Sequence, residues 1–133
     1  MKKVWYKGGV ALPVRAVRGA TTIDDNTVRE IVKETRHLLC IMIEENNINK
    51  DDIISIMFSA TRDIDAAFPA AAAREIGLTD VALMCTNEME VPGSLQKCIR
   101  VLMHINTEKT NKEIKYIYLK NAKALRPDLT GKV

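Results

Sequence analysis

The fold is decided by residues 28–59, VREIVKETRHLLCIMIEENNINKDDIISIMFS, which join a long amphipathic segment to a short apolar one. Apolar side chains recur at spacings of three and four in the first part, which predicts a helix with one buried face. We expect that face to hold Val28, Ile31, Val32, Thr35, Leu38, Leu39, Met42 and Ile43. Asn46-Asn47 ends the helix, and the short, β-branched segment at 53–59 indicates a buried strand.

The flanking sequence predicts further strands and a second helix. We expect strands at residues 10–17, 81–85 and 97–106, a helix at 70–76, and loops at 18–22 and 86–94. Residues 113–119 fit either a helix or a strand. Asp24, Asp25 and Asn26 offer oxygens that could cap the first helix, and Gly77 ends the second. These elements predict an α+β fold, with helices packed on one face of a mixed β-sheet.

The predicted strand at 97–106 has two different faces. One face is apolar and holds Ile99, Val101, Met103 and Ile105; the other holds Cys98, Arg100, Leu102, His104 and Asn106. A face that mixes charged and apolar groups suits an interface or a ligand better than a dry core. We therefore expect the sheet face away from the helices to be solvated or covered by another subunit.

Length and composition limit the class of protein. The 133 residues (14.9 kDa) are the size of one domain. The excess of 20 basic over 17 acidic residues, +3, is too small to indicate a nucleic-acid partner. No stretch approaches the roughly 18 apolar residues that a membrane span needs. The odd number of cysteines (Cys40, Cys85 and Cys98), without a Cys-x-x-Cys pair or a signal peptide, indicates a cytoplasmic protein.

The two ends of the sequence differ from the middle. Residues 1–11 show no alternation, and Lys7-Gly8-Gly9 interrupts any regular element. Lys-Gly-Gly is also what a purine-rich ribosome-binding tract would encode, which would place the native start near Val14. We expect residues 1–13 to be an N-terminal extension that is either disordered or not native. Residues 14–129 should form the domain, and residues 130–133 should form a mobile tail after the polar segment that begins at Pro127.

The usual equipment for nucleophilic or metal-assisted catalysis is missing from the sequence. It contains no P-loop, no dinucleotide-binding glycine motif, no His-Glu-x-x-His and no nucleophile elbow. Its two histidines, His37 and His104, come without an acidic motif, so we expect no metal site.

Arginine is the chemical feature that remains. Several of the eight avoid the helix surfaces where solvated charges normally lie: Arg15 and Arg18 at the end of a predicted strand, Arg74 near the end of a short helix, Arg100 in the middle of a strand, and Arg126 before Pro127. Guanidinium groups are preferred partners of carboxylates, so several that converged in one pocket would bind a small polyanion. An ordinary salt bridge remains the alternative, and it explains the mid-strand Arg100 least well.

Residues after the strand predicted at 81–85 are also candidates, because strand ends are common ligand positions. Glu88 fits this role, with a solvated loop residue as the alternative. Cys85 fits it too, although a small buried apolar residue is the commoner role of cysteine. Phe68-Pro69 is either a ligand wall or the start of a helix.

A series of ordered segments between Val14 and Leu129 resembles one known family. The segments are 14–22 (VRAVRGATT), 59–61 (SAT), 68–70 (FPA), 85–89 (CTNEM), 98–101 (CIRV), 117–119 (IYL) and 125–129 (LRPDL). In this order they resemble the α/β class of chorismate mutase, the trimeric monofunctional type. The resemblance implies a homotrimeric pseudo-α/β-barrel with active sites between neighbouring subunits. It also implies cofactor-free conversion of chorismate to prephenate in phenylalanine and tyrosine biosynthesis.

The resemblance implies a role for each matching residue. Arg100 matches the arginine against the substrate's ether oxygen, Arg18 matches one that holds a carboxylate, and Glu88 matches a group at the hydroxyl. The other implied substrate-binding residues are Phe68, Arg74, Met84, Cys85, Thr86, Asn87, Tyr118, Leu125 and Arg126. Ala71 stands where the family often has lysine, and Met84 where a small polar residue is common. We therefore expect weaker electrostatic capture of the substrate.

The implied reaction agrees with the residues present. A pericyclic rearrangement needs no nucleophile and no general base, and arginines suit a dicarboxylate substrate. Two alternatives remain. Imine deaminases of the RidA-like group form a similar trimer and use an arginine, but they lack the Cys-x-x-Glu-Met segment found at 85–89. A non-catalytic trimer that binds small carboxylates is the other, and only Ala71 favours it.

Overall fold

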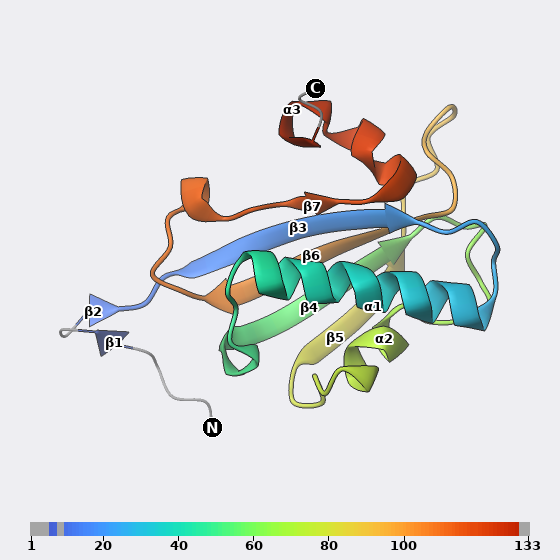
Figure 1. Ribbon diagram of the computed structural model, residues 1–133. Coiled ribbons are helices and arrows are strands. Elements are labelled where there is room, and N and C mark those ends of the chain that lie inside the picture. Colours follow the sequence, from blue (N-terminus) through green and yellow to red (C-terminus); the bar gives the residue numbers. More distant parts are fainter. Residues whose placement is uncertain (1–5, 8–9, 131–133) are drawn as a thin grey trace.

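A five-stranded mixed sheet forms the body of the protein (Figure 1). The structure is a computed structural model that describes residues 6–7 and 10–130. The sheet contains β3 (Val14–Thr22), β4 (Ile53–Ala60), β5 (Ala82–Asn87), β6 (Cys98–Asn106) and β7 (Ile117–Tyr118). Their order is β5-β4-β6-β3-β7; β6 is antiparallel to both neighbours, whereas β4–β5 and β3–β7 are parallel pairs. The predicted α+β class is confirmed.

Two α-helices cover one face of this sheet, which we call the covered face. The helix α1 (Val28–Glu45) links β3 to β4, and α2 (Ala70–Glu75) links β4 to β5. A crossover between parallel strands places its helix on the sheet face, and α1 and α2 are in contact there. Gly19 on β3 permits the close approach of α1, because a Cβ atom there would lie 2.5 Å from Met42 Sδ.

The ends of α1 differ in detail from the prediction. Its N-cap is Thr27, whose Oγ1 accepts a hydrogen bond from Glu30 N at 3.1 Å, rather than any of residues 24–26. Asn26 instead bonds to the Asp65 carboxylate and to the backbone N–H groups of residues 65 and 66. Val28, expected on the buried face, is 57% exposed, and Glu34, which is not among the residues expected on that face, is buried.

Two predicted loops are strand instead. Residues 18–22 continue β3, because every residue of this segment pairs with β6 as far as Thr22 opposite Cys98. Thr86 and Asn87, also expected in a loop, continue β5 alongside β4. In the ambiguous segment 113–119, Glu113 ends the short helix η2 (Asn111–Glu113), and residues 117–118 form the strand β7.

Regular structure also extends toward both ends. The strands β1 (Tyr6–Lys7) and β2 (Val10–Ala11) pair with each other, so the prediction of no regular element before residue 10 is wrong at Tyr6–Lys7. The strand predicted at 10–17 is divided between β2 and β3. The C-terminal segment forms the helices η3 (Lys120–Leu125) and α3 (Pro127–Thr130), and η1 (Lys50–Asp52) precedes β4. The parts of the predicted extension and tail at 1–5, 8–9 and 131–133 lie outside the described residues.

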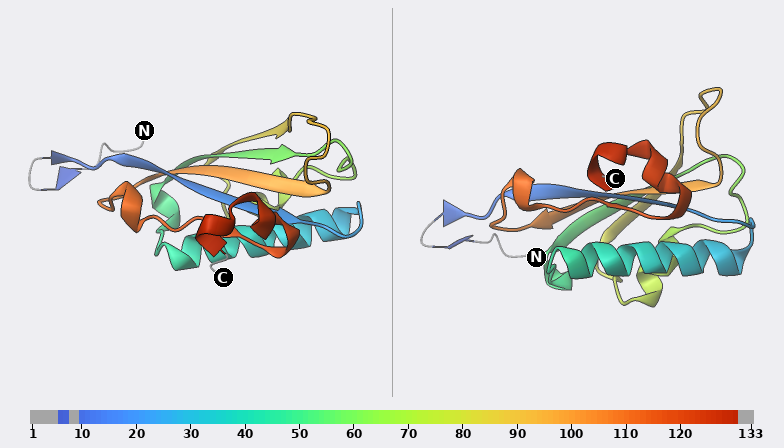
Figure 2. Two further views of the ribbon diagram at one scale, coloured as in Figure 1. Left: turned by 90° about the horizontal axis from the view of Figure 1, so that it is seen from above. Right: turned by 45° about the horizontal axis from the view of Figure 1, so that its top comes forward.

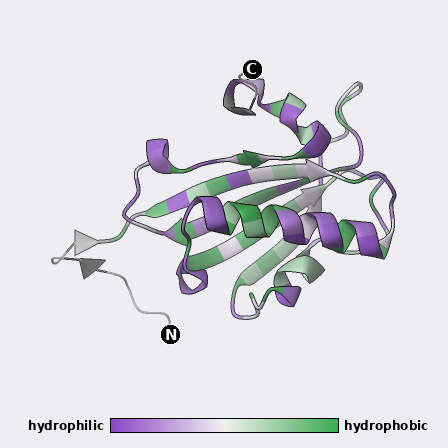
Figure 3. Ribbon diagram, viewed as in Figure 1, coloured by the Kyte–Doolittle hydropathy of each residue, from purple (hydrophilic) through white to green (hydrophobic). Residues whose placement is uncertain are grey.

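The opposite face of the sheet, which we call the open face, has no α1 or α2 over it. In the right-hand view of Figure 2, α1 lies below the sheet, and η3 and α3 lie above it. Strand pairing brings these residues to the open face: Ala16, Arg18, Ala20, Ser55, Met57, Ser59, Ala82, Met84, Thr86, Arg100, Leu102 and His104. Hydropathy alternates along the strands accordingly (Figure 3). In the described part of the chain, no helix is long and apolar enough to cross a membrane.

Candidate active site

A pocket of about 210 Å³ lies on the open face, where the ends of the central strands meet. It is lined by Arg18, Met57, Phe58, Ser59, Thr86, Glu88, Arg100, Val101 and Leu102. These residues come from β3, β4, β5 and β6 and from the position just after β5. The sheet register therefore assembles the pocket from segments that are far apart in the sequence.

Strand pairing explains why the two central arginines meet. Arg100 lies opposite Ala20 on β3, and Arg18 lies opposite Leu102 on β6, so both side chains emerge on the open face on adjacent strands. Glu88 reaches the same place because its N–H donates to the Ala60 carbonyl at 2.9 Å. This bond holds the start of the loop after β5 against the end of β4.

An ion pair occupies the centre of the pocket. Arg100 Nε lies 2.6 Å from Glu88 Oε2, and both side chains are 25% exposed. The Nε atom is buried and its N–H is not aligned with an acceptor, so the contact is an ion pair rather than a linear hydrogen bond. Ser59 Oγ donates to the other carboxylate oxygen, Glu88 Oε1, at 2.7 Å. Glu88 is therefore held from two sides, and it fixes Arg100.

Arg18 is chemically different from Arg100. Among the described residues, no carboxylate lies within ion-pair distance of Arg18, which is half-buried. Counting Arg18, Arg100 and Glu88, the pocket has a formal charge of +1. The cation that this chain leaves unmatched in the pocket is therefore Arg18, which suits an incoming carboxylate.

The buried thiol of Cys98 reports on the same charges. Burial raises its pKa, Arg100 and Arg18 oppose that rise, and Glu88 adds to it. The thiol is therefore neutral near pH 7. Cys98 lies two residues before Arg100 on β6, so both side chains lie on the same face of the strand.

Several predicted site residues lie elsewhere in the chain. Phe68, Cys85 and Asn87 line a second pocket of about 500 Å³, which shares Thr86 with the first. Strand alternation accounts for Cys85 and Asn87, which point to the opposite side of β5 from Met84 and Thr86. Phe68 lies on the connection between β4 and α2. Cys85 is half-buried against the core, as its alternative interpretation expects.

The remaining candidates form no part of the first pocket. Arg74 is exposed on α2, and Met84 is 57% exposed on the open face beside Met57. Tyr118 is buried and packs with Leu125 in a cluster under η3. Arg126 bonds to Asp128 through Nε at 3.1 Å and Nη2 at 3.0 Å. Asp128, together with Tyr118, raises the Arg126 pKa.

Sequence reasoning missed Ser59 as a site residue, although its segment supported the family resemblance. The signal for it is the alternation of Ser55 and Ser59 with apolar residues, which gives β4 a polar face. Other polar candidates have ordinary partners: Arg15 Nε donates to the Lys109 carbonyl at 3.0 Å, and His104 Nδ1 lies 3.2 Å from Ser55 Oγ. Within residues 6–7 and 10–130, no group of three or more His, Cys, Asp or Glu side chains is arranged to hold a metal ion.

Comparison with known proteins identifies relatives that share most of this chain. The family model "Chorismate mutase type I" matches residues 14–129. "Chorismate mutase AroH" of Bacillus subtilis is 43% identical over 118 residues, which are 88% of this chain and 93% of that protein. "Chorismate mutase AroH" of Thermus thermophilus is 43% identical over 117 residues, 87% of this chain and 96% of that protein.

A solved structure agrees with these sequence relatives. The chorismate mutase from Clostridium thermocellum superposes with a TM-score of 0.82 at 61% sequence identity, covering 83% of this chain and 98% of that one. Neither an imine deaminase nor a non-catalytic binding protein is among these relatives. With a family model that spans residues 14–129 and relatives aligned over most of their length, the chain belongs to the chorismate mutase type I family.

Proposed function

We propose that the pocket on the open face is where this chain, as a chorismate mutase, rearranges chorismate to prephenate. The observation that supports it most is the meeting in one pocket of Arg18 from β3, Arg100 from β6 and Glu88 from the position just after β5. In the [3,3] rearrangement the ether C–O bond breaks as a new C–C bond forms within the same molecule. The reaction consumes no proton, nucleophile or cofactor, so binding geometry and charge are all that the protein must supply.

Arg100 is the residue that we assign to the reacting ether oxygen. Negative charge develops on this oxygen as its bond to carbon breaks, so a fixed cation beside it stabilises the transition state more than the substrate. The Glu88 carboxylate and Ser59 hydroxyl fix Arg100 before the substrate arrives. Glu88 also lies where it can orient the substrate's ring hydroxyl. Arg18, which lacks an ion-pair partner among the described residues, is assigned to a substrate carboxylate.

The charge of the pocket supports a site shared between subunits. Chorismate has two carboxylates, whereas the pocket of one chain has a formal charge of +1. The open face also exposes Met57 (41%) and Met84 (57%), which suits contact with another copy of the chain. We assign the second cation and the apolar walls to a neighbouring subunit of a homotrimer, with Arg74 and Phe68 as its contributions. Phe68 is 72% exposed in the single chain.

We place the enzyme in the cytoplasm. All three cysteines are free thiols, which suits a reducing compartment. The substrate is a small molecule, and the charge of +3 does not favour a nucleic-acid partner.

The test is to mix purified protein with chorismate and follow the loss of the substrate's absorbance, with the oligomeric state measured by sedimentation. We expect rapid loss of chorismate, formation of prephenate and a trimer. An intact trimer that does not accelerate the reaction would reject the proposed function. A fully active monomer would reject the shared site while leaving the activity in place.

A further inference from the structure

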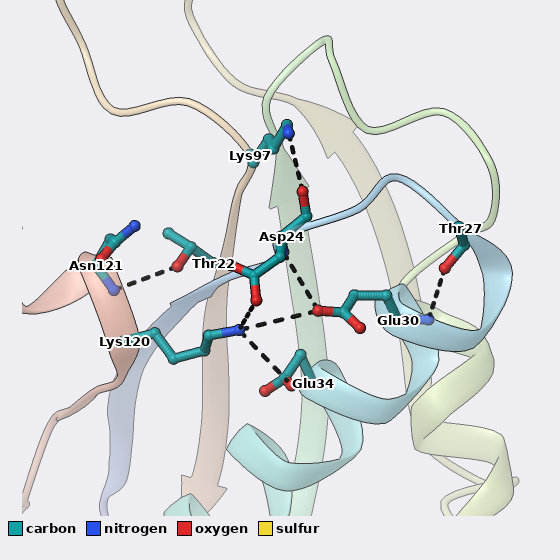
Figure 4. A network of polar contacts seen from close by, with 8 residues as sticks. All are labelled: Thr22, Asp24, Thr27, Glu30, Glu34, Lys97, Lys120 and Asn121. Carbon is teal, nitrogen blue, oxygen red and sulfur yellow. Dashed lines mark hydrogen bonds and ion pairs between the residues drawn. The ribbon is translucent and has the colours of Figure 1, made fainter.

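A charge cluster outside the pocket holds the C-terminal segment against the start of α1. Lys120 Nζ lies 3.5 Å from Asp24 Oδ2, 3.9 Å from Glu30 Oε2 and 3.8 Å from Glu34 Oε2 (Figure 4). The Glu34 side chain is only 12% exposed, and the Glu30 side chain is 21% exposed. Carboxylates withdrawn from water need a compensating charge, and in this Lys120 cluster the ammonium supplies it.

The backbone at Lys120 is fixed as well. Its φ of +53° lies in the left-handed region, which a non-glycine residue keeps only when its surroundings hold it there. On one side, the Leu119 N–H donates to the Ala20 carbonyl at 2.9 Å. On the other side, the Asn121 N–H donates to Thr22 Oγ1 at 3.2 Å (Figure 4). These two bonds hold the turn to β3, while the ammonium holds it to α1.

This turn determines where η3 lies relative to the pocket. The chain leaves β7 at Tyr118 and enters η3 at Lys120. Ala122 of η3 belongs to the same buried cluster as Ala20 and Cys98, and Ala20 lies opposite Arg100 in the sheet. Leu125 packs against that cluster, so the position of η3 sets where the following arginine, Arg126, begins.

We propose that Lys120 is a positioning residue for substrate binding. Its ammonium, held by Asp24, Glu30 and Glu34, fixes the β7–η3 turn and so keeps Leu125 and Arg126 beside the pocket. This inference rests on the proposed function, which assigns the substrate to that pocket. Lys120 acts on binding rather than on the rearranging bonds, because Arg100 is held independently by Glu88. Loss of the ammonium should therefore weaken the binding of the substrate and of the transition state equally. KM then rises and kcat stays unchanged.

Steady-state kinetics with chorismate on a set of Lys120 variants tests this role. We expect Lys120→Met to raise KM about tenfold, with kcat within about twofold of the parent, and Lys120→Arg to restore KM. Lys120→Gly accepts the left-handed backbone but lacks the ammonium, so it should resemble Lys120→Met. A Lys120→Gly variant with the parent KM would show that the backbone alone sets the turn, and would overturn the proposal.

A charge exchange gives an independent arm of the test. Lys120→Glu alone should raise KM further, because it adds a fourth carboxylate, and combining it with Glu34→Lys should recover most of the loss. Lys33→Met, an exposed lysine on the outer side of α1, is the matched control and should keep the parent KM. If the double variant has a KM as high as that of Lys120→Glu alone, the Lys120 cluster does not act through its charges, and the proposal is wrong.

Hydrogen exchange separates this proposal from the proposed function. In Lys120→Met we expect faster amide exchange centred on residues 117–128, with a lower melting temperature because Glu30 and Glu34 lose their compensating charge. The positioning role is wrong if Lys120→Met shows the parent's amide exchange in residues 117–128. It is also wrong if the parent is active and the variant has the same KM. A parent without chorismate turnover rejects the proposed function instead, and the exchange experiment then still decides whether Lys120 holds the segment.

Discussion

The covered and open faces of the sheet are built from the same strands but follow different rules. On β6, Val101 and Met103 are at most 1% exposed beneath α1, whereas Arg100 and Leu102, their neighbours in sequence, remain half-buried on the open face. Side chains on the covered face, such as Val101 and Met103, pack in the core between the sheet and the helices. The open face holds an ion pair, a hydroxyl and an unmatched guanidinium, because α1 and α2 do not cover it. The residues that stabilise the fold therefore lie on the covered face, and the residues of the candidate site lie on the open face of the same strands. Substitutions can test this separation.

Replacing Arg100 on the open face should have the largest effect. We expect Arg100→Ala to lower kcat about 100- to 1,000-fold, because a preorganised charge partner of the transition state is worth about 3 kcal/mol or more. Thermal unfolding should change little. Arg74→Ala, which removes an exposed arginine on α2, should mainly raise KM. Equal losses of kcat in the two variants would show that the roles are assigned wrongly.

Gly19, the neighbour of Arg18 on β3, tests the covered face. Gly19→Ala should reduce the free energy of unfolding by about 1–3 kcal/mol, because its new methyl group would overlap Met42 Sδ. Denaturant titration measures this loss, and kcat per folded molecule should stay close to that of the parent. A large loss of kcat without loss of stability would break the separation of the two faces.

Ser59 tests whether the support of Glu88 matters. We expect Ser59→Ala to lower kcat/KM about tenfold, since a hydrogen bond to a charged group contributes about 1.5–3 kcal/mol. Ser55→Ala, on the same strand and face but bonded to His104, is the matched control and should stay close to the parent. Kinetics at saturating and limiting chorismate separates the effects on kcat and KM. If both variants lost activity equally, the effect would belong to the strand rather than to Glu88.

Glu113, on the connection between β6 and β7, should give the smallest effect. Hydrogen bonds from the backbone N–H and the hydroxyl of Thr110 lower the Glu113 pKa from its usual 4.5. A carboxylate with a lowered pKa in the folded state adds stability above its unfolded pKa, and this is lost as the pH falls through the folded value. Glu113→Gln should thus lower the melting temperature slightly at pH 7 and not at pH well below 4.5. If Glu113→Gln still melts at a lower temperature than the parent in acid, the charge of Glu113 is not the cause of the effect.

Periodicity in the sequence predicts the covered face well and the ends of elements less well. The apolar spacing in residues 28–45 identifies α1 because burial against a sheet selects that spacing directly. The same spacing does not reveal that Glu34 is buried. The partner that compensates its charge, Lys120, lies 86 positions away in the sequence. Similarly, residues 18–22 were predicted as a loop because local sequence does not reveal their pairing with β6.

The site could be predicted only in part for a related reason. Arg18, Thr86, Glu88 and Arg100 meet in one pocket, as the family resemblance implies. Arg74, Phe68 and Cys85 do not join them within one chain, because strand alternation and the helix crossover place them on the covered side. The motifs of the sequence indicate which residues resemble the family's site, but not which of them meet in space. In the proposed homotrimer, Arg74 and Phe68 would reach the pocket from a neighbouring subunit.

The central claim is that Arg100 faces the ether oxygen of the rearranging substrate. A crystal structure with a dicarboxylate ether that mimics the transition state tests it most directly. We predict that the Arg100 guanidinium will lie within hydrogen-bond distance of the ether oxygen, with Arg18 on a carboxylate. A mimic whose ether oxygen contacts another group, with Arg100 turned away and still paired only with Glu88, would contradict the account.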